Sequence, residues 1–434
     1  MATPGQRRLP VDLPNEIIAL VLEELAKNTK KAIANLRLTC KRLHDVSEPV
    51  FFRSILLEST FPYDDAQHCL NVRQERHSHV QDLTMVYGFG ISKHHPSMPQ
   101  CLGSFKNLKS MRISAFAFND YQDFRLFCTI LDYQLTTNAF SELKECSISL
   151  KSFDKTSALK ISSLLKACKL SKLALHYIDL RDINSTSSLI GHHSCLKELE
   201  LNECAWDATT LAAILAVPSK LETFAVEMQI PKRRHSPNLY DEQLETLQKT
   251  INLLSEKQKS LKTLKLTVDD WDRYYFNLSQ TLDFTGLHGV KEMSFKTTGG
   301  RLPFMPFENL PNCERLEIFL TEPVSLLLIA RNLKEHRSNG GSSRVPKSLR
   351  RLDIFADDRD GSYDGFRFSE NAKIRVGMKE LMEILEIPHL TYTQQGGSPS
   401  WKTFSAEWDP TSTDGDIAVK ELSGNQVDAV TMYW

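Results

Sequence analysis

The segment Leu196-Lys-Glu-Leu199-Glu-Leu201-Asn-Glu-Cys204 decides the fold of this chain. Its apolar residues follow the order apolar-x-x-apolar-x-apolar, so Leu199 and Leu201 stand two residues apart. Successive side chains of a strand point to opposite faces, so Leu199 and Leu201 share one face and Glu200 lies on the other. The segment therefore predicts a short strand with one buried face.

The same pattern recurs nine more times along the chain. The copies begin at Val80, Leu108, Leu143, Leu170, Leu221, Leu261, Val290, Cys313 and Leu349. The steps from residue 170 to 196 and from 196 to 221 match a repeat period of about 20–29 residues. Longer steps, from 221 to 261 and from 313 to 349, indicate insertions.

Apolar residues at helical spacing separate several of these copies. The four clearest groups are Phe124, Phe127, Cys128 and Leu131; Ile161, Leu164, Leu165 and Cys168; Leu211, Ile214 and Leu215; and Leu244, Leu247, Ile251 and Leu254. Each unit is thus a strand followed by a helix, and stacked units form a parallel sheet that the outer helices curve. The pattern resembles the leucine-rich repeat, including Cys204 at its Asn/Cys position. The resemblance implies an α/β horseshoe solenoid over residues 80–390.

A different pattern occupies the N-terminal region. Pro14 suits the first turn of a helix, and Glu16 suits the positive end of the helix dipole. The apolar residues that follow are Ile17, Ile18, Val21, Leu22 and Leu25. This stripe is wider than packing against one neighbour requires, so one side can face the chain's own domain and the other a partner.

Three blocks in this region resemble an F-box: Leu13-Pro14-x-Glu16-Ile17, Leu36-Arg-Leu38-Thr-Cys40-Lys-Arg-Leu43 and Pro49-Val-Phe-Phe52. Each block alone would also suit any small helical subdomain. The resemblance implies a small all-α domain of two or three helices that docks on the linker Skp1 and, through it, on a cullin. The implied Skp1-binding residues are Leu13, Pro14, Glu16, Ile17, Ile18, Val21, Leu22, Leu25, Leu36, Leu38, Cys40 and Leu43. The lysine-rich residues 26–32, expected to form a loop, depart from the family pattern.

We predict four segments: an F-box at 8–55, a connector at 56–79, the solenoid at 80–390 and a C-terminal tail or cap at 391–434. The last segment is polar but keeps Trp401, Phe404 and Trp408. Large apolar groups of this kind seldom stay in water. They either cap the last repeat or fold back on the concave face.

Period-two geometry also defines the concave face, which is the candidate target-binding surface. It comprises Arg112, Lys172, His176, Glu198, Glu200, Asn202, Glu227, Lys265, Lys296, Arg315, Glu317, Phe319, Arg351, Asp353 and Phe355, with Trp271, Tyr274 and Tyr275 after one strand. Acidic residues gather in the middle repeats and basic ones in the last, which either orients a charged target or is an ordinary solvated face. The aromatic residues are either target contacts or core.

Composition narrows the function further. The chain has 53 Lys and Arg against 54 Asp and Glu, so a net charge of -1 gives no bulk attraction to nucleic acid. Nine scattered cysteines predict reduced thiols in the cytoplasm or nucleus. No stretch approaches the roughly 20 apolar residues of a membrane span.

Recognisable catalytic motifs are missing from the sequence, and the spacing of His192, His193 and Cys195 does not suit a structural zinc site. We expect no enzyme, metal or cofactor. The resemblance predicts a substrate-recognition adaptor of an SCF-type ubiquitin ligase. The alternative is a Skp1-bound or free interaction scaffold outside ubiquitination, and an enzyme built on a repeat scaffold would need catalytic residues that the sequence does not reveal.

Overall fold

The structure of the chain is a computed structural model. It describes residues 13–58, 73–87, 102–116, 121–137, 140–151, 157–158, 161–181, 192–229, 238–269, 282–297, 310, 312–320, 348–357, 371–395, 401–408 and 417–422. The chain divides into two compact units. Unit 1 comprises Met1–Leu196 with Cys204–Trp206, and unit 2 comprises Lys197–Glu203 with Asp207–Trp434.

Unit 1 begins with three helices, α1 (Asn15–Asn28), α2 (Lys30–Arg37) and α3 (Lys41–Phe52). The prediction of a loop over residues 26–32 is wrong, because only Thr29 separates α1 from α2 there. Thr29 is extended and its amide still donates to the Leu25 carbonyl at 3.0 Å, so the chain turns within one residue. The apolar core of these helices consists of Ile18, Leu22, Ile33, Leu43 and Val50.

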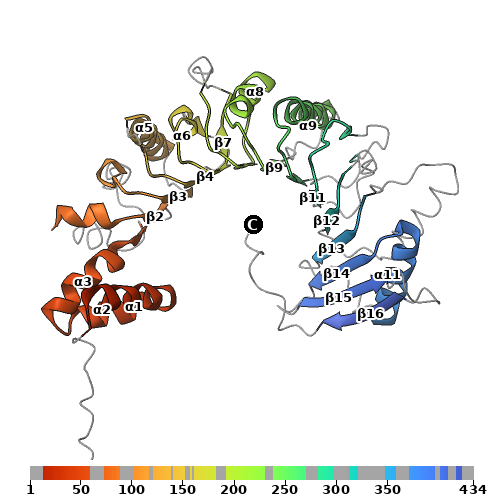
Figure 1. Cartoon of the computed structure of the whole chain (residues 1–434). Helices are drawn as coiled ribbons and strands as arrows, with labels where there is room; N and C mark the ends of the chain where they lie inside the picture. Colours follow the sequence, from red (N-terminus) through yellow and green to blue (C-terminus); the bar gives the residue numbers. More distant parts are fainter. Residues whose placement is uncertain are drawn as a thin grey trace, which may run out of the picture. The chain divides into compact units, whose positions relative to one another are not determined.

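A parallel sheet follows in unit 1. Its strands, in spatial order, are β1 (Ser54–Glu58), β2 (Asp82–Tyr87), β3 (Ser110–Phe116), β4 (Glu145–Lys151) and β6 (Lys172–His176). The remaining elements are η2 (Gln74–His79), α5 (Tyr121–Thr137), α6 (Ser162–Leu165) and the paired strands β5 (Ser157–Ala158) and β7 (Ile178–Asp179). Helices α5 and α6 lie on one side of the sheet (Figure 1). The sequence did not predict β1, and the predicted boundary at 55/56 falls inside it.

Unit 2 continues the same alternation. Its parallel strands are β8 (Glu198–Asn202), β9 (Thr223–Gln229), β10 (Thr263–Asp269), β11 (Glu292–Thr297), β12 (Arg315–Leu320), β13 (Arg351–Asp357) and β14 (His389–Gln395). Two antiparallel strands, β15 (Trp401–Trp408) and β16 (Ile417–Leu422), complete the sheet. Helices α8 (Ala208–Ala216), α9 (Asn238–Lys257) and α11 (Asn371–Leu385) lie on its outer side (Figure 1).

The register of the strands explains why both sheets are buried on the helix side. In unit 2, neighbouring strands place apolar side chains at one register position, so that these side chains form a row on the same face of the sheet. The row consists of Leu199, Phe224, Leu264, Met293 and Leu316, and each is at most 1% exposed. Such a row removes apolar surface from water all along the sheet, and this burial stabilises the fold by about 25 cal/mol per Å² of apolar surface. Since every predicted repeat core forms a parallel strand, the expected α/β class with mostly parallel sheets is confirmed.

A recurring hydrogen-bond pattern marks the entry to the parallel strands β2–β4, β6 and β9–β13. One carbonyl accepts from two consecutive amides of the next strand, at 2.7–3.1 Å. The Lys109 carbonyl does so in unit 1, and the Lys262 and Glu314 carbonyls do so in unit 2. The repeat in the sequence is therefore also a repeat in backbone geometry.

The C-terminal segment contains regular structure rather than a polar tail. The predicted boundary at 390/391 falls inside β14, and Phe404 of β15 is fully buried. Thr393 and Thr403 join β14 to β15 through a buried hydroxyl pair 3.2 Å apart. Among the helices that the structure describes, none is sufficiently long and apolar to cross a membrane.

Candidate functional site

Helix α1 divides its apolar residues between two faces. Ile18 and Leu22 are buried in the helical core. The adjoining face carries Leu13, Ile17, Leu20 and Val21, which are 38–61% exposed. Ile17, Leu20 and Val21 fall at i, i+3 and i+4, which places them on one side of the helix, and Leu13 lies two residues before its first residue. We call these four residues the docking stripe.

The other predicted Skp1-binding residues differ in their exposure. Pro14, Glu16 and Leu38 are exposed, and Leu38 is the most exposed large apolar residue described at 85%. Leu25, Leu36 and Cys40 are partly buried against the helical core.

Three of the predicted contact residues need correction, because Ile18, Leu22 and Leu43 are core residues. Their side chains hold α1 against α3 and cannot also reach a partner. Leu20 replaces them on the accessible surface. Its spacing of three residues from Ile17 was the signal in the sequence that could have identified it.

Arg42 fixes the start of the docking stripe. Its Nε donates to Asn15 Oδ1 at 2.9 Å, and its Nη2 donates to the Leu13 carbonyl at 2.5 Å. Helix α3 therefore holds the first turn of α1. Leu38 precedes α3 by three residues, so its exposed side chain belongs to the same end of the helical group.

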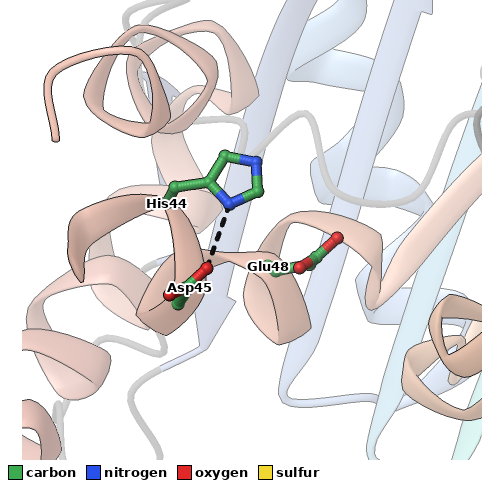
Figure 2. Close-up of side chains that lie close together, drawn as sticks. All are labelled: His44, Asp45 and Glu48. Carbon is green, nitrogen blue, oxygen red and sulfur yellow. Dashed lines mark hydrogen bonds and ion pairs between the residues drawn. The ribbon is translucent and has the colours of Figure 1, made fainter. Parts of the chain in front are cut away.

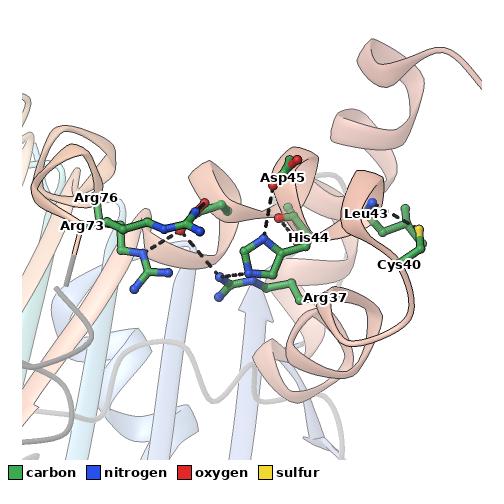
Figure 3. Close-up of polar contacts among 9 residues, drawn as sticks. Arg37, Cys40, Leu43, His44, Asp45, Arg73 and Arg76 are labelled. Atoms are coloured by element: carbon green, nitrogen blue, oxygen red, sulfur yellow. Dashed lines mark hydrogen bonds and ion pairs between the residues drawn. The ribbon is translucent and has the colours of Figure 1, made fainter.

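A second polar centre surrounds Glu48 of α3, and Figure 3 labels its three arginines, Arg37, Arg73 and Arg76. Arg76 Nε lies 2.6 Å from Glu48 Oε1, Arg73 Nη1 lies 3.2 Å from Oε2, and Arg37 Nη2 lies 3.8 Å from Oε1. Burial raises the pKa of Glu48, but the hydrogen bond from Arg76 and the charges of the three arginines outweigh it and lower the pKa overall. We call these four residues the arginine clamp.

Three potential metal ligands lie close together in α3 (Figure 2). One ligand atom from each of His44, Asp45 and Glu48 lies within 4.8 Å of the other two. His44 Nδ1 lies 3.4 Å from Asp45 Oδ1, and its Nε2 lies 3.3 Å from Arg37 Nη2. Both oxygens of Glu48 are already held by arginines. A cation would have to displace them and then sit beside their positive charge, so the arrangement suits an ion-pair clamp better than a metal site.

Aromatic rings reinforce the clamp. The guanidinium of Arg76 lies 4.6 Å from the Phe52 ring centroid, and that of Arg37 lies 4.4 Å from the Phe51 centroid. Cation–π contacts of this kind contribute about 0.5–2 kcal/mol each. The clamp thereby joins η2, which precedes β2, to helices α2 and α3.

The predicted concave residues lie on the sheet faces, on the side away from the buried rows. In unit 1, Arg112 and Lys172 are exposed and His176 is partly exposed. In unit 2, Glu198 is exposed, whereas Glu200, Asn202 and Lys265 are partly exposed. Trp271, Tyr274 and Tyr275 lie outside the described residues.

The face of β12 and β13 carries a charged network. Asp353 accepts from Arg315 Nε at 2.9 Å and from Arg351 Nε at 2.9 Å. Arg315 Nη2 also lies 2.7 Å from Glu317 Oε1. Asp353 lies on the predicted face, but its side chain is only 1% exposed beneath the two arginines.

In this network, burial and the neighbouring charges shift the pKa values of Glu317 and Arg315 in opposite directions. Burial raises the pKa of Glu317 and outweighs the opposing charge of Arg315. Burial lowers the pKa of Arg315, but the charges of Glu317 and Asp353 more than compensate and raise it. Arg315 therefore stays charged.

Two phenylalanines stand beside the network. The rings of Phe319 and Phe355 stack with centroids 4.5 Å apart and planes 7° from parallel. Both are partly exposed and occupy the same register position on adjacent strands. We call this pair the aromatic plate.

Comparison with known proteins assigns no family to this chain. No family model matches the chain, and no curated protein matches it.

Proposed function

We propose that this chain is a substrate-recognition adaptor of an SCF-type ubiquitin ligase. In this proposal helices α1–α3 form an F-box that docks a Skp1-like linker, and the leucine-rich repeats hold a protein target. The observation that carries the proposal is the docking stripe, an exposed apolar face on α1 directly beside a buried one.

The concentration of exposed apolar side chains supports the docking half. Ten large hydrophobic side chains are exposed in the described chain, and five of them lie between Leu13 and Leu38. Fully burying one such side chain contributes about 1.5–3 kcal/mol relative to leaving it exposed. A partner that covers a few half-exposed residues therefore gains several kcal/mol, which suits a stable protein contact.

The position of the docking helices supports the adaptor half. The arginine clamp ties α3 to η2, and β1 follows α3 after a single residue. The docking helices and the first strands of unit 1 are thus held together by the largely buried Glu48–Arg76 ion pair and by the short connection from α3 to β1. An adaptor needs such a connection, because it accelerates ubiquitin transfer by positioning the target beside other subunits.

The repeat geometry supports the receptor half. A stacked strand–helix repeat requires three features that this chain has: the doubly accepting carbonyls before β2–β4, β6 and β9–β13, the parallel register and the outer helices. The surface residues of such a repeat can vary without loss of the scaffold.

The test is affinity purification of the full chain from cell extract, with Skp1 and a cullin each measured by immunoblot. The adaptor proposal expects both to be recovered in stoichiometric amounts. Recovery of Skp1 without a cullin would contradict the adaptor proposal and favour the scaffold alternative. Recovery of neither would overturn both.

A further inference from the structure

One row of the sheet in unit 2 carries no charged residue from β12 to β16. The row consists of the residues that share one register position on successive strands, Phe319, Phe355, Thr393, Thr403 and Leu422. It lies on the open face, because the residues that alternate with it, such as Tyr392 and Phe404, are buried on the side of α11 (Figure 1). We call it the uncharged row. The aromatic plate forms one end of this row, and the last residue of β16 forms the other.

The neighbouring row on the same face is polar and charged. It consists of Glu317, Asp353, Thr391, Ser405 and Lys420. Its two hydroxyl residues, on β14 and β15, are partly exposed. Thr393 and Thr403 of the uncharged row are only 3% and 5% exposed, and their hydroxyls are paired at 3.2 Å. Because the polar atoms of this row already satisfy each other, the row suits an apolar occupant better than a charged one.

The chain itself continues from the end of the uncharged row. Residues 423–434, Ser-Gly-Asn-Gln-Val-Asp-Ala-Val-Thr-Met-Tyr-Trp, follow Leu422 directly and lie outside the described residues. This segment opens with residues that favour turns, and Asp428 is its one charged side chain. It also contains Met432, Tyr433 and Trp434, and large apolar groups of this kind seldom remain in water. The sequence therefore supplies an apolar occupant at the edge of an uncharged surface.

Strand spacing shows that this occupant can reach the aromatic plate. Leu422 and Phe355 are separated by three strand-to-strand steps, and Phe319 lies one step further. At about 4.8 Å per step these distances are roughly 14 and 19 Å. An extended chain covers about 3.3 Å per residue, so the stretch from Asn425 to Met432 spans up to about 23 Å. Met432 and the two aromatic residues after it can therefore contact both rings.

We propose that the aromatic plate binds residues 432–434 of its own chain, with the preceding residues crossing β14 and β15 along the uncharged row. Tethering favours this occupant, because a short flexible link gives an effective concentration on the order of 1 mM. A contact with a dissociation constant of about 0.1 mM then keeps the plate about 90% occupied. This inference does not rest on the proposed function. If that function is correct, a target that uses the plate must first displace the segment.

The experiment is photo-crosslinking of the full chain with p-benzoylphenylalanine in place of Phe355. Trypsin releases residues 421–434 as one peptide, because no Lys or Arg follows Lys420. We expect this peptide to be the main cross-linked product, with the new bond at Met432, Tyr433 or Trp434. A mixture of isotope-labelled and unlabelled chain identifies the origin of the peptide. Cross-links between labelled and unlabelled chains would assign the plate to a second copy, and cross-links only to other segments, or none, would also overturn the proposal.

Val376 provides the control position for this experiment. It is 48% exposed on α11, the helix on the opposite side of the same sheet (Figure 1). p-Benzoylphenylalanine in place of Val376 should leave residues 421–434 without a cross-link. Equal capture from both positions would show that the segment has no preference for the plate, and the proposal would be wrong.

A binding measurement tests whether the plate is occupied. A fluorescein-labelled peptide of residues 423–434 should bind the variant Met432→Ser with Tyr433→Ser and Trp434→Ser about tenfold more tightly than the original chain, where the tethered segment competes. Adding Phe319→Ala and Phe355→Ala to that variant should remove binding, with circular dichroism to check the fold. Equal binding to the original chain and the variant, or binding that survives loss of the plate, would overturn the proposal. Neither measurement depends on recovery of Skp1, so this inference and the proposed function can fail separately.

Discussion

Arg76 of η2 and Glu48 of α3 meet at 2.6 Å, and each side chain is only 12% exposed. They are 28 residues apart in the chain. Because both are largely out of water, separating them costs more than separating a surface pair. This contact holds the helical group against the segment that leads into β2.

Glu48→Gln should destabilise this junction. The variant leaves Arg37, Arg73 and Arg76 clustered without their counter-charge, so we expect a loss of about 2–3 kcal/mol. Hydrogen–deuterium exchange of peptides from α3 and η2 measures this loss locally. Unchanged exchange in both peptides at neutral pH would contradict it.

The same substitution should alter the acid sensitivity of the junction. The pKa of Glu48 is lowered in the folded protein, so its stabilisation is complete above the unfolded pKa and is lost as the pH falls through the folded pKa. The difference in junction stability between Glu48→Gln and the original protein should therefore narrow as the pH falls below about 4.3, the ordinary pKa of Glu. A gap that stays constant or widens in acid would show that Glu48 does not act through its charge.

Ile17→Asp with Leu20→Asp should reduce Skp1 recovery at least tenfold while leaving the fold intact. Both residues are already exposed, at 44% and 61%, so the added charges cost little in the free chain. In a docked complex the same charges would be buried without partners, which costs several kcal/mol. Pull-down with purified Skp1 is the measurement.

The chain offers an exposure-matched control for this variant. Leu126 and Tyr133 of α5 are 45% and 63% exposed in the same unit. Leu126→Asp with Tyr133→Asp should not change Skp1 recovery. Equal loss with both pairs would mean that the effect is not local to the docking stripe.

The parts of the fold that apolar spacing governs could be predicted from the sequence. Leu199 and Leu201 are buried and Glu198, directly before Leu199, is exposed, because period-two alternation is a local property. The arginine clamp could not be predicted, since its partners lie up to 28 residues apart and nothing local distinguishes Arg76 from any surface arginine. The burial of Asp353 could not be predicted either, because alternation places it correctly on the open face and only the two arginines beside it bury it.

Gln258 is another residue whose role the sequence conceals. It lies 4% exposed just beyond α9, where Nε2 donates to the Leu215 and Pro218 carbonyls and Oε1 accepts from the Leu221 amide. Gln258→Leu keeps the volume but leaves these buried backbone groups without partners. We expect a loss of about 2–4 kcal/mol, measured by thermal unfolding and by exchange of the α8–β9 connection.

Gln248, within α9, provides the comparison for Gln258. Its amide likewise bridges to backbone, donating to the Asp283 carbonyl at 3.1 Å and accepting from the Asp283 amide at 2.7 Å, but in an exposed setting. Water can replace those bonds, so Gln248→Leu should cost less than about 1 kcal/mol. Similar losses for the two variants would refute the importance of burial at Gln258.

Glu317→Gln should change the pH dependence of stability in the opposite direction to Glu48→Gln. Burial raises the pKa of Glu317, so the folded protein holds this proton more tightly than the unfolded chain does. Its contribution therefore becomes less favourable as the pH rises from the unfolded pKa through the folded pKa. The amide variant lacks this change, and its stability relative to the original protein should increase as the pH rises from about 4 to 7. Exchange of peptides covering β12 and β13 across this range measures the trend. A relative stability that falls with rising pH would mean that the charge of Arg315, rather than burial, dominates at Glu317.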